Sequence, residues 1–221
     1  LAAQPPPKEK MAVPVMLYVP NLIGYIRVAC MVASFYLAQT DFAWSFALYM
    51  ANFAGDLVDG FFARKLNQAS KFGGVLDMVT DRVSTAGLCV LLAVLYPKHA
   101  FQYIMLIVID ISSHWFHVVS AKGHHKDEKG NFILSLYYGF YPFFGYCCLS
   151  QEFFYLAKWA LFFHPDLHVQ AANHTVTLAE VAQWVFLPGL IAKQVVNAAQ
   201  WWNAAGALAE GDRLERENKR G

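Results

Sequence analysis

Charged side chains are scarce in this sequence: Asp, Glu, Lys and Arg make up 15% of the 221 residues, whereas hydrophobic residues make up 57%. Soluble domains usually contain about 45–50% apolar and about 25% charged residues. The shortage of charge therefore argues against a soluble domain and indicates a membrane protein. The net charge of +1 is uninformative by itself, and no nucleic-acid partner is expected.

Cysteine is also scarce, and an N-terminal apolar run is missing. The first ten residues are polar and proline-rich, so they do not resemble a cleavable signal peptide. We predict a disordered tail over residues 1–10 and a first span that serves as its own anchor. The cysteines lie inside predicted helices without metal-binding spacing, and we expect them to be small buried residues: Cys30, Cys89, Cys147 and Cys148.

Long apolar stretches dominate the rest of the chain. A transmembrane helix needs about 20 predominantly apolar residues. Six stretches have suitable length, near residues 18–39, 42–64, 73–96, 100–121, 132–162 and 176–204. Gly139, Pro142 and Gly145 could kink the fifth, which is longer than a straight span. The sequence predicts an all-α, polytopic domain of six transmembrane helices over residues 11–205, followed by a charged tail over 206–221.

Basic residues are unevenly distributed between the predicted loops. The loops on one side of the predicted spans carry only Lys98. Cytoplasmic loops carry an excess of Lys and Arg, so we expect both termini and the 65–72 link in the cytosol. The basic residues on that side are Lys8, Lys10, Lys65, Lys71, Lys122, Lys126, Lys129, Arg213, Arg216, Lys219 and Arg220.

Four carboxylates interrupt the second and third stretches in the pattern Asp56-x2-Asp59-Gly60-x2-Ala63-Arg64-x8-Gly73-x3-Asp77-x3-Asp81. An ionised side chain at the centre of a bilayer costs about 3 kcal/mol on insertion scales. Residues three or four apart share a helix face, so each helix aims one aspartate pair into a common cleft. Carboxylate oxygens suit Mg2+ or Mn2+, which often bridge carboxylates to substrate phosphates. The pattern indicates divalent cations and a phosphorylated substrate.

This motif resembles, at every fixed position, the signature of the CDP-alcohol phosphotransferases, integral membrane enzymes that join a CDP-activated lipid or alcohol to an acceptor hydroxyl. The resemblance implies that Asp56, Asp59 and Asp77 hold two divalent ions, Mg2+ or Mn2+. It also implies that Asp81 activates the acceptor as a base while contacting one metal. Two metals can stabilise both the attacking and the leaving oxygen of an in-line displacement at phosphorus.

The flanking sequence is similar, within that family, to the eukaryotic phosphatidylinositol synthases from about residue 17 to 160. The similarity implies transfer of the phosphatidyl group from CDP-diacylglycerol to myo-inositol, giving phosphatidylinositol and CMP. It further implies phospholipid biosynthesis in the endoplasmic reticulum membrane, a homodimer, and an active site facing the cytosol. The matching segments are 19–25, 66–68, 76–78, 80–82, 95–97 and 113–115.

Residues around the motif are candidates for CDP-diacylglycerol binding. Gly60, Ala63 and Gly73 are small enough to clear space for a nucleotide, although small residues also mediate helix packing in membranes. Arg64 can offer a bidentate fork to a pyrophosphate, and Ser70 matches a position that the resemblance associates with this substrate.

Two polar residues of the first stretch, Asn21 and Arg27, match the family pattern near the nucleotide pocket. Either could instead mark the membrane interface or pair with an aspartate. The sequence leaves all three interpretations open.

The acceptor pocket is constrained only by depth. Polar residues buried in a membrane are functional candidates by default, and Asp110, His114 and Lys193 lie in the cytosolic halves of the fourth and sixth stretches. They are candidates for inositol binding, although hydrogen bonding between helices explains such residues equally well. Other hypotheses are a family member that uses glycerol 3-phosphate or serine, and a divalent-cation transporter.

Overall fold

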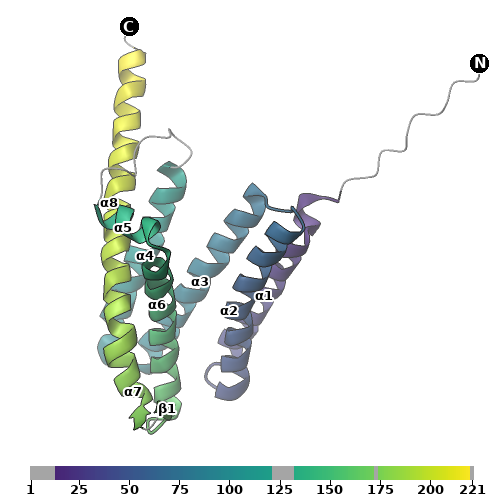
Figure 1. Cartoon of the computed structure of the whole chain (residues 1–221), viewed down its shortest axis with the longest axis vertical. Coiled ribbons are helices and arrows are strands. Elements are labelled where there is room, and N and C mark those ends of the chain that lie inside the picture. Colours follow the sequence, from purple (N-terminus) through teal and green to yellow (C-terminus); the bar gives the residue numbers. More distant parts are fainter. Residues whose placement is uncertain (1–12, 121–131, 172–173, 220–221) are drawn as a thin grey trace, which may run out of the picture. The chain divides into compact units, whose positions relative to one another are not determined.

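The computed structural model describes residues 13–120, 132–171 and 174–219 (Figure 1). The predicted disordered tail, residues 1–10, lies outside them. The chain forms two compact units, Leu1–Ser84 and Thr85–Gly221. Unit 1 contains η1 (Val15–Leu17), α1 (Val19–Leu37), α2 (Phe42–Lys65) and the start of α3 (Lys71–Leu95). Unit 2 contains the rest of α3, followed by η2 (Pro97–His99), α4 (Ala100–Ser120), α5 (Phe132–Gly139), α6 (Tyr141–Phe163), β1 (His168–Ala171), β2 (His174–Thr177), α7 (Leu178–Val181), η4 (Ala182–Phe186) and α8 (Leu187–Asn218).

In unit 1, α1 and α2 pack along faces that recur every three or four residues. The buried face of α1 includes Arg27, Met31 and Ser34, and that of α2 includes Ser45, Tyr49, Asn52 and Asp59. The Ser34 hydroxyl donates to the Ser45 carbonyl at 2.7 Å, and the Ser45 hydroxyl donates to the Ser34 carbonyl at 2.6 Å. This reciprocal pair fixes the register of the two helices on the same faces that carry Arg27 and Asp59.

Side-chain caps and one left-handed residue shape the short link between α2 and α3. Asn67 has φ 52°, a conformation that Asn tolerates better than most residues. The Ser70 hydroxyl accepts from the Gly73 backbone N–H at 3.0 Å, and the Gln68 side chain accepts from the Val19 N–H at 2.9 Å. These bonds satisfy free N–H groups at the starts of α3 and α1. The start of α3 is thereby placed beside the end of α2 and the start of α1 (Figure 1).

Unit 2 is built on α4, α6 and α8, with α8 in contact with both other helices. A core cluster joins α5, α6 and α8 through Leu134, Tyr137, Cys147 and Val196. Of the four cysteines, all free, Cys89 and Cys147 are buried, whereas Cys30 and Cys148 are half-buried.

The fifth predicted stretch, 132–162, is divided into α5 and α6, which meet at 93°. Phe140 between them has φ −116° and ψ 88°, and Pro142 lies in the first turn of α6. Proline lacks an N–H, so it is tolerated in the first turn of a helix but kinks or breaks a helix interior. The expected kink is therefore a break, with a new helix that starts at the proline.

The last predicted stretch also differs from the structure. An antiparallel hairpin, β1 paired with β2, adds a small β element to the predicted all-α fold, and its second strand occupies the start of the stretch 176–204. At the other end, α8 continues to Asn218, through most of the segment expected as a tail. Arg213 donates to both Glu210 (2.9 and 2.6 Å) and Glu217 (2.5 Å), pairs at helical spacing that favour the helix.

Within the described residues, three helices are long and apolar enough to cross a membrane: Val19–Leu37, Lys71–Leu95 and Pro97–Ser120. A fourth arises if the bent pair of α5 and α6 counts as one span. Neither α2, which carries Asp56 and Asp59, nor α8, which ends in the charged segment, is among them. The structure therefore supports a helical membrane protein with three to four candidate spans.

Ser34→Ala should lower the stability of unit 1 by about 1 kcal/mol, because it removes one half of a buried interhelical pair. The midpoint of thermal unfolding in detergent measures the effect. Ser120→Ala is the control, because the Ser120 hydroxyl donates to the His117 carbonyl of its own helix and not to another helix among the described residues. Equal midpoints for the two variants would contradict the role given to the pair.

Candidate active site

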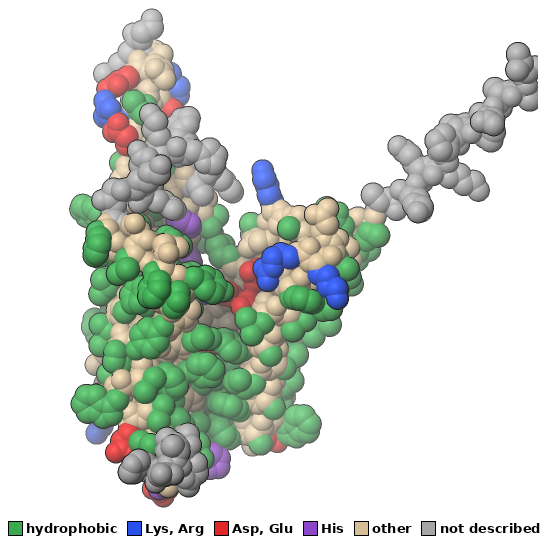
Figure 2. Space-filling view, in the orientation of Figure 1, with side chains coloured by type: hydrophobic (Ala, Val, Ile, Leu, Met, Phe, Trp, Pro, Cys, Tyr) green, Lys and Arg blue, Asp and Glu red, His purple; other side chains and the backbone are tan. Residues whose placement is uncertain are grey.

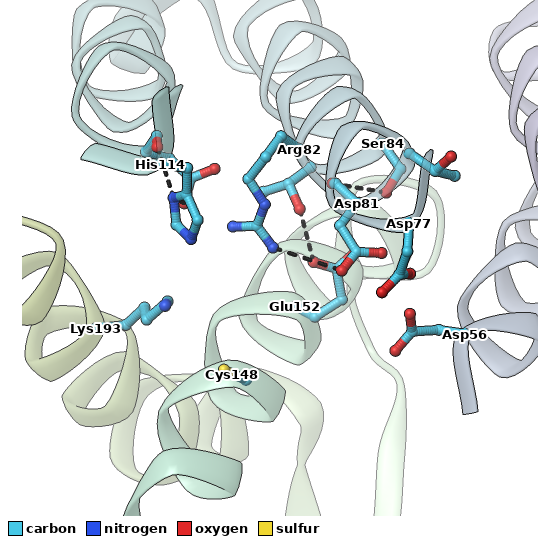
Figure 3. Close-up of polar contacts among 12 residues, drawn as sticks. Asp56, Asp77, Asp81, Arg82, Ser84, His114, Cys148, Glu152 and Lys193 are labelled. Atoms are coloured by element: carbon cyan, nitrogen blue, oxygen red, sulfur yellow. Dashed lines mark hydrogen bonds and ion pairs between the residues drawn. The ribbon is translucent and has the colours of Figure 1, made fainter. Parts of the chain in front are cut away.

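The four motif aspartates converge within unit 1. Asp56 and Asp59 lie one turn apart on α2, and Asp77 and Asp81 lie one turn apart on α3. Figure 3 shows the carboxylates of Asp56, Asp77 and Asp81 pointing into a common space. One carboxylate oxygen from each of Asp56, Asp59 and Asp77 lies within 4.8 Å of the other two. This spacing, with hard oxygen donors, fits a divalent cation such as Mg2+ or Mn2+.

Arg27 of α1 lies among these carboxylates. Its Nη1 donates to Asp59 Oδ2 at 2.6 Å and to Asp77 Oδ1 at 2.7 Å. Its Nη2 donates to Asp81 Oδ1 at 2.5 Å and lies 3.1 Å from Asp56 Oδ1. Of the three interpretations of Arg27 that the sequence leaves open, pairing with an aspartate is the one that the structure shows, and it involves all four aspartates.

Arg27 cannot balance the charge of the cluster. Four ionised carboxylates and the Arg27 guanidinium sum to −3 (1 − 4), or to −2 (2 − 4) when Arg82, whose Nη2 lies 3.9 Å from Asp81 Oδ2, is counted as well; either charge requires further cations or protons in an apolar setting. The arginine bonds use a single oxygen of each carboxylate. The side chains of Asp56, Asp77 and Asp81 are 37%, 45% and 32% exposed, so ions can approach. The donor set, the spacing and the access therefore all fit divalent metal binding.

A cleft of about 190 Å³ adjoins the carboxylates. Asp59 and Asp77 line it, and most of the other lining residues are small. The remaining lining residues are Pro20, Asn21, Gly24, Gly60, Ala63, Gln68, Ala69, Ser70, Gly73, Gly74 and Leu76. Five of the predicted contacts with CDP-diacylglycerol therefore line the cleft. They are Asn21, Gly60, Ala63, Ser70 and Gly73.

Asn21 and Gly73 meet at close range in this cleft. Asn21 is 1% exposed, and its side-chain amide donates to the Val15 carbonyl at 2.5 Å. A Cβ on Gly73 would lie 2.8 Å from Asn21 Oδ1 and 3.2 Å from Ser70 Oγ. Gly73 is therefore needed so that α3 can start against α1. Asn21 and Ser70 both have structural contacts here, since Ser70 caps α3.

Arg64 lies in the last turn of α2, next to the residues that line the cleft. It is exposed, and a Cβ on Gly60 would lie 3.5 Å from its Nη1, so the guanidinium lies back over Gly60. A basic residue in the last turn also complements the helix dipole. Arg64 is thus available to an anion near the cleft.

The three predicted inositol contacts lie in unit 2. Asp110 accepts from Asn197 Nδ2 at 3.2 Å, and His114 Nδ1 lies 2.8 Å from the Asp110 carbonyl and 3.7 Å from Asp110 Oδ1. Lys193 Nζ, one turn before Asn197 on α8, donates to Tyr137 OH at 2.8 Å. Figure 3 shows His114 and Lys193 extending from α4 and α8 towards the same space. Asp110 and Lys193 are buried, whereas His114 is half-buried.

Several contributors to the two clusters were not singled out from the sequence. Tyr137 is 2% exposed and accepts from Lys193. In the sequence it belongs to a continuous run of aromatic residues, so nothing singled out its hydroxyl group. Gly55 makes room for Arg27, because a Cβ there would lie 2.7 Å from Arg27 Cγ. No local pattern distinguishes this glycine. Gln68, which caps α1, was marked in the sequence only by the family resemblance of segment 66–68.

Comparison with known proteins connects this geometry to a family. The family model described as CDP-alcohol phosphatidyltransferase matches residues 17–163. The chain belongs to this family. The match covers all of unit 1 from just before α1, and it continues to the end of α6. The matched residues include the four aspartates and the residues that line the cleft.

Curated relatives narrow the family. CDP-diacylglycerol–inositol 3-phosphatidyltransferase 1 of Arabidopsis thaliana is 37% identical over 226 residues, covering 97% of this chain and 97% of the relative. The CDP-diacylglycerol–inositol 3-phosphatidyltransferase of Saccharomyces cerevisiae is 35% identical, over 93% of this chain and 92% of the relative. The Homo sapiens protein of the same name is 34% identical, over 93% and 98%. No solved structure matches the chain.

Gly73→Ala should destabilise this family member by about 1–3 kcal/mol, because the added methyl group overlaps Asn21 Oδ1 and overpacks the contact between α1 and α3. Thermal unfolding in detergent measures the loss. Gly206→Ala serves as the control, since a Cβ there meets no atom within 4 Å. An unchanged midpoint for Gly73→Ala would show that Asn21 and Ser70 can move aside.

Proposed function

We propose that this chain is a CDP-diacylglycerol–inositol 3-phosphatidyltransferase. It transfers the phosphatidyl group of CDP-diacylglycerol to a hydroxyl of myo-inositol and releases CMP. The names of relatives that align over nearly the whole chain support the substrates. The convergence of four carboxylates on one accessible site in unit 1 is the observation that carries the chemistry.

The aspartates are proposed to bind two divalent ions, Mg2+ or Mn2+, through Asp56, Asp59, Asp77 and Asp81. Bound ions supply Lewis acidity for the attacking and leaving oxygens of an in-line displacement at phosphorus. The net negative charge that remains around Arg27 and the spacing of the oxygens support this assignment. The chain's contribution is to hold the carboxylates in position and to leave them open on one side.

Asp81 is proposed as the base that accepts the proton of the inositol hydroxyl. Arg27 Nη2 holds its Oδ1 at 2.5 Å, which orients the carboxylate, and its Oδ2 lies 3.9 Å from Arg82 Nη2. A positioned carboxylate within hydrogen-bond reach of the hydroxyl can take its proton as the bond to phosphorus forms. CMP then leaves with the electron pair of the broken P–O bond.

CDP-diacylglycerol is proposed to bind the cleft next to the carboxylates. Gly60, Ala63 and Gly73 provide a wall without bulky side chains, and the backbone is therefore accessible to a nucleotide. The guanidinium of Arg64 can donate to a diphosphate oxygen. Ser70 and Asn21 are proposed to contact the substrate as well, in addition to the structural bonds that they make.

Myo-inositol is proposed to contact Asp110, His114 and Lys193. A polyol requires both acceptors and donors, which a carboxylate, an imidazole and an ammonium group provide. The depth of Asp110 and Lys193, each 4% exposed, supports a desolvated pocket in which hydroxyl groups are read by hydrogen bonds. These contacts concern unit 2 alone.

For the membrane arrangement, we propose six spans in one catalytic domain, residues 11–205, with α2 and α8 added to the candidate spans and both termini in the cytosol. Exposed Arg64, Lys65 and Lys71 gather where α2 ends and α3 begins, whereas hydrophobic side chains cover much of the helix sides (Figure 2). That asymmetry supports a cytosolic position for this end. An endoplasmic reticulum location, a homodimer and a cytosolic segment 206–221 complete the proposal.

The reaction is tested with purified full-length protein and a panel of alcohols. We expect CMP release from CDP-diacylglycerol with myo-inositol, dependent on Mg2+ or Mn2+ and lost after chelation, because the carboxylates then lack their ions. Release with glycerol 3-phosphate or serine in place of inositol would overturn the acceptor but keep the family chemistry. Metal flux in proteoliposomes without any CMP release would instead indicate a transporter.

Asp81→Asn should lower kcat by about 100-fold or more, since an amide cannot accept the hydroxyl proton. Binding of CDP-diacylglycerol should change far less, which equilibrium dialysis with labelled substrate can measure. Glu210→Gln is a matched control in the exposed end of α8. Turnover at the wild-type rate in Asp81→Asn would remove Asp81 from the role of base.

A further inference from the structure

The bonds of Arg27 cross-connect two helices. Nη1 bridges Asp59 of α2 and Asp77 of α3, at 2.6 and 2.7 Å. Nη2 bridges Asp56 of α2 and Asp81 of α3, at 3.1 and 2.5 Å. Each terminal nitrogen therefore takes one aspartate from each helix, and the two bridges are separated by the width of one guanidinium group.

The surroundings leave Arg27 little freedom to make other contacts. Arg27 is 2% exposed, and its Nε finds no hydrogen-bond partner among the residues that the structure describes. Its aliphatic stem passes over Gly55, where a Cβ would lie only 2.7 Å from Cγ. Gly55 thus provides the space in which the side chain reaches the carboxylates, and the guanidinium is held by the carboxylates alone.

Four ionised carboxylates this close repel each other, so a cation between them favours the close approach of α2 and α3. A guanidinium is planar and presents its donors in a fixed fork, whereas a lysine ammonium is a single point charge on a flexible stem. The two terminal nitrogens can therefore set the spacing between the aspartate pairs. Only one oxygen per carboxylate is used, so the arginine does not occupy the whole donor set.

We propose that Arg27 is a positioning residue that ties the aspartates of α2 to those of α3 and sets the spacing at which their remaining oxygens bind divalent cations. This inference rests on the metal-dependent function proposed above. In this proposal, Gly55 leaves the space that the Arg27 side chain needs to reach the aspartates. Arg27 acts through the aspartates and has no contact with substrate in this account.

The test is Mn2+ binding to the purified full-length protein in lipid nanodiscs, measured by electron paramagnetic resonance without substrate. Arg27→Gln removes the charge and the fork, and Arg27→Lys keeps the charge but removes the fork. Gly55→Ala keeps the arginine and displaces its stem. Ser34→Ala is the control, because it weakens the same α1–α2 contact two turns away from Arg27.

We expect Arg27→Gln and Arg27→Lys to weaken Mn2+ binding by about 10-fold or more, the size of effect seen when groups that orient metal ligands are removed. Gly55→Ala should weaken it by roughly 3-fold or more for the same reason. Ser34→Ala should bind as the wild type does. In activity assays, the Mn2+ concentration for half-maximal rate should rise in step with these affinities, while helix content by circular dichroism stays unchanged.

Unchanged or tighter Mn2+ binding by Arg27→Gln would overturn the proposal and show that the arginine is only a competing counter-ion. Wild-type affinity in Arg27→Lys would show that charge alone suffices, which also overturns it. If Arg27→Gln does not fold, Gly55→Ala decides, and wild-type affinity there counts against the proposal. Failure of the wild type itself to bind Mn2+ or release CMP would refute the proposed function instead.

Discussion

The mutual repulsion of four carboxylates in an apolar helical unit is the constraint on which the site depends. Arg27 offsets part of this repulsion through four contacts between 2.5 and 3.1 Å, and a net negative charge remains. Ionised groups with no counter-charge are not maintained in such surroundings. A partly exposed cluster that keeps this deficit is suited to bind cations, and the bound cations can then hold a diphosphate.

Close helix approach makes this arrangement possible. Gly55 admits the arginine stem between α1 and α2, and Gly73 lets α3 start against Asn21. The reciprocal serine pair holds the same two helices in register further along. Small residues therefore do two things in unit 1: they bring the charged groups together, and they leave a cleft beside them. From the sequence, the small residues could either mediate helix packing or clear space beside the aspartates. The structure shows both, the close packing at Gly73 and the cleft.

The convergence of the aspartates could be predicted because residues three or four apart share a helix face and a short link, residues 65–72, joins the two helices that carry them. The membrane class followed from composition, and the family followed from the fixed motif. The arginine contacts could not be derived, since they depend on the distance between α1 and two other helices. Gly55 gave no local signal at all.

Differences in the rest of the chain have similar causes. The break at Phe140 arises because Pro142 can start a helix but cannot continue one, and a hydropathy pattern alone does not tell a kink from a break. The hairpin β1–β2 interrupts the predicted all-α fold just before the last helix. Arg213 and its partners Glu210 and Glu217 stabilise the helical end of α8. The high charge of this segment led to the prediction of a tail.

The most direct test of the central claim is the thermal unfolding midpoint of the wild-type protein as a function of free Mn2+, starting from chelated buffer. A ligand bound only by the folded state stabilises it in proportion to the logarithm of its concentration, by about 2.7 kcal/mol at 100 times the dissociation constant. Cation binding by the converged carboxylates predicts a midpoint that rises steadily once Mn2+ exceeds that constant. A midpoint that stays constant over the whole range would contradict it.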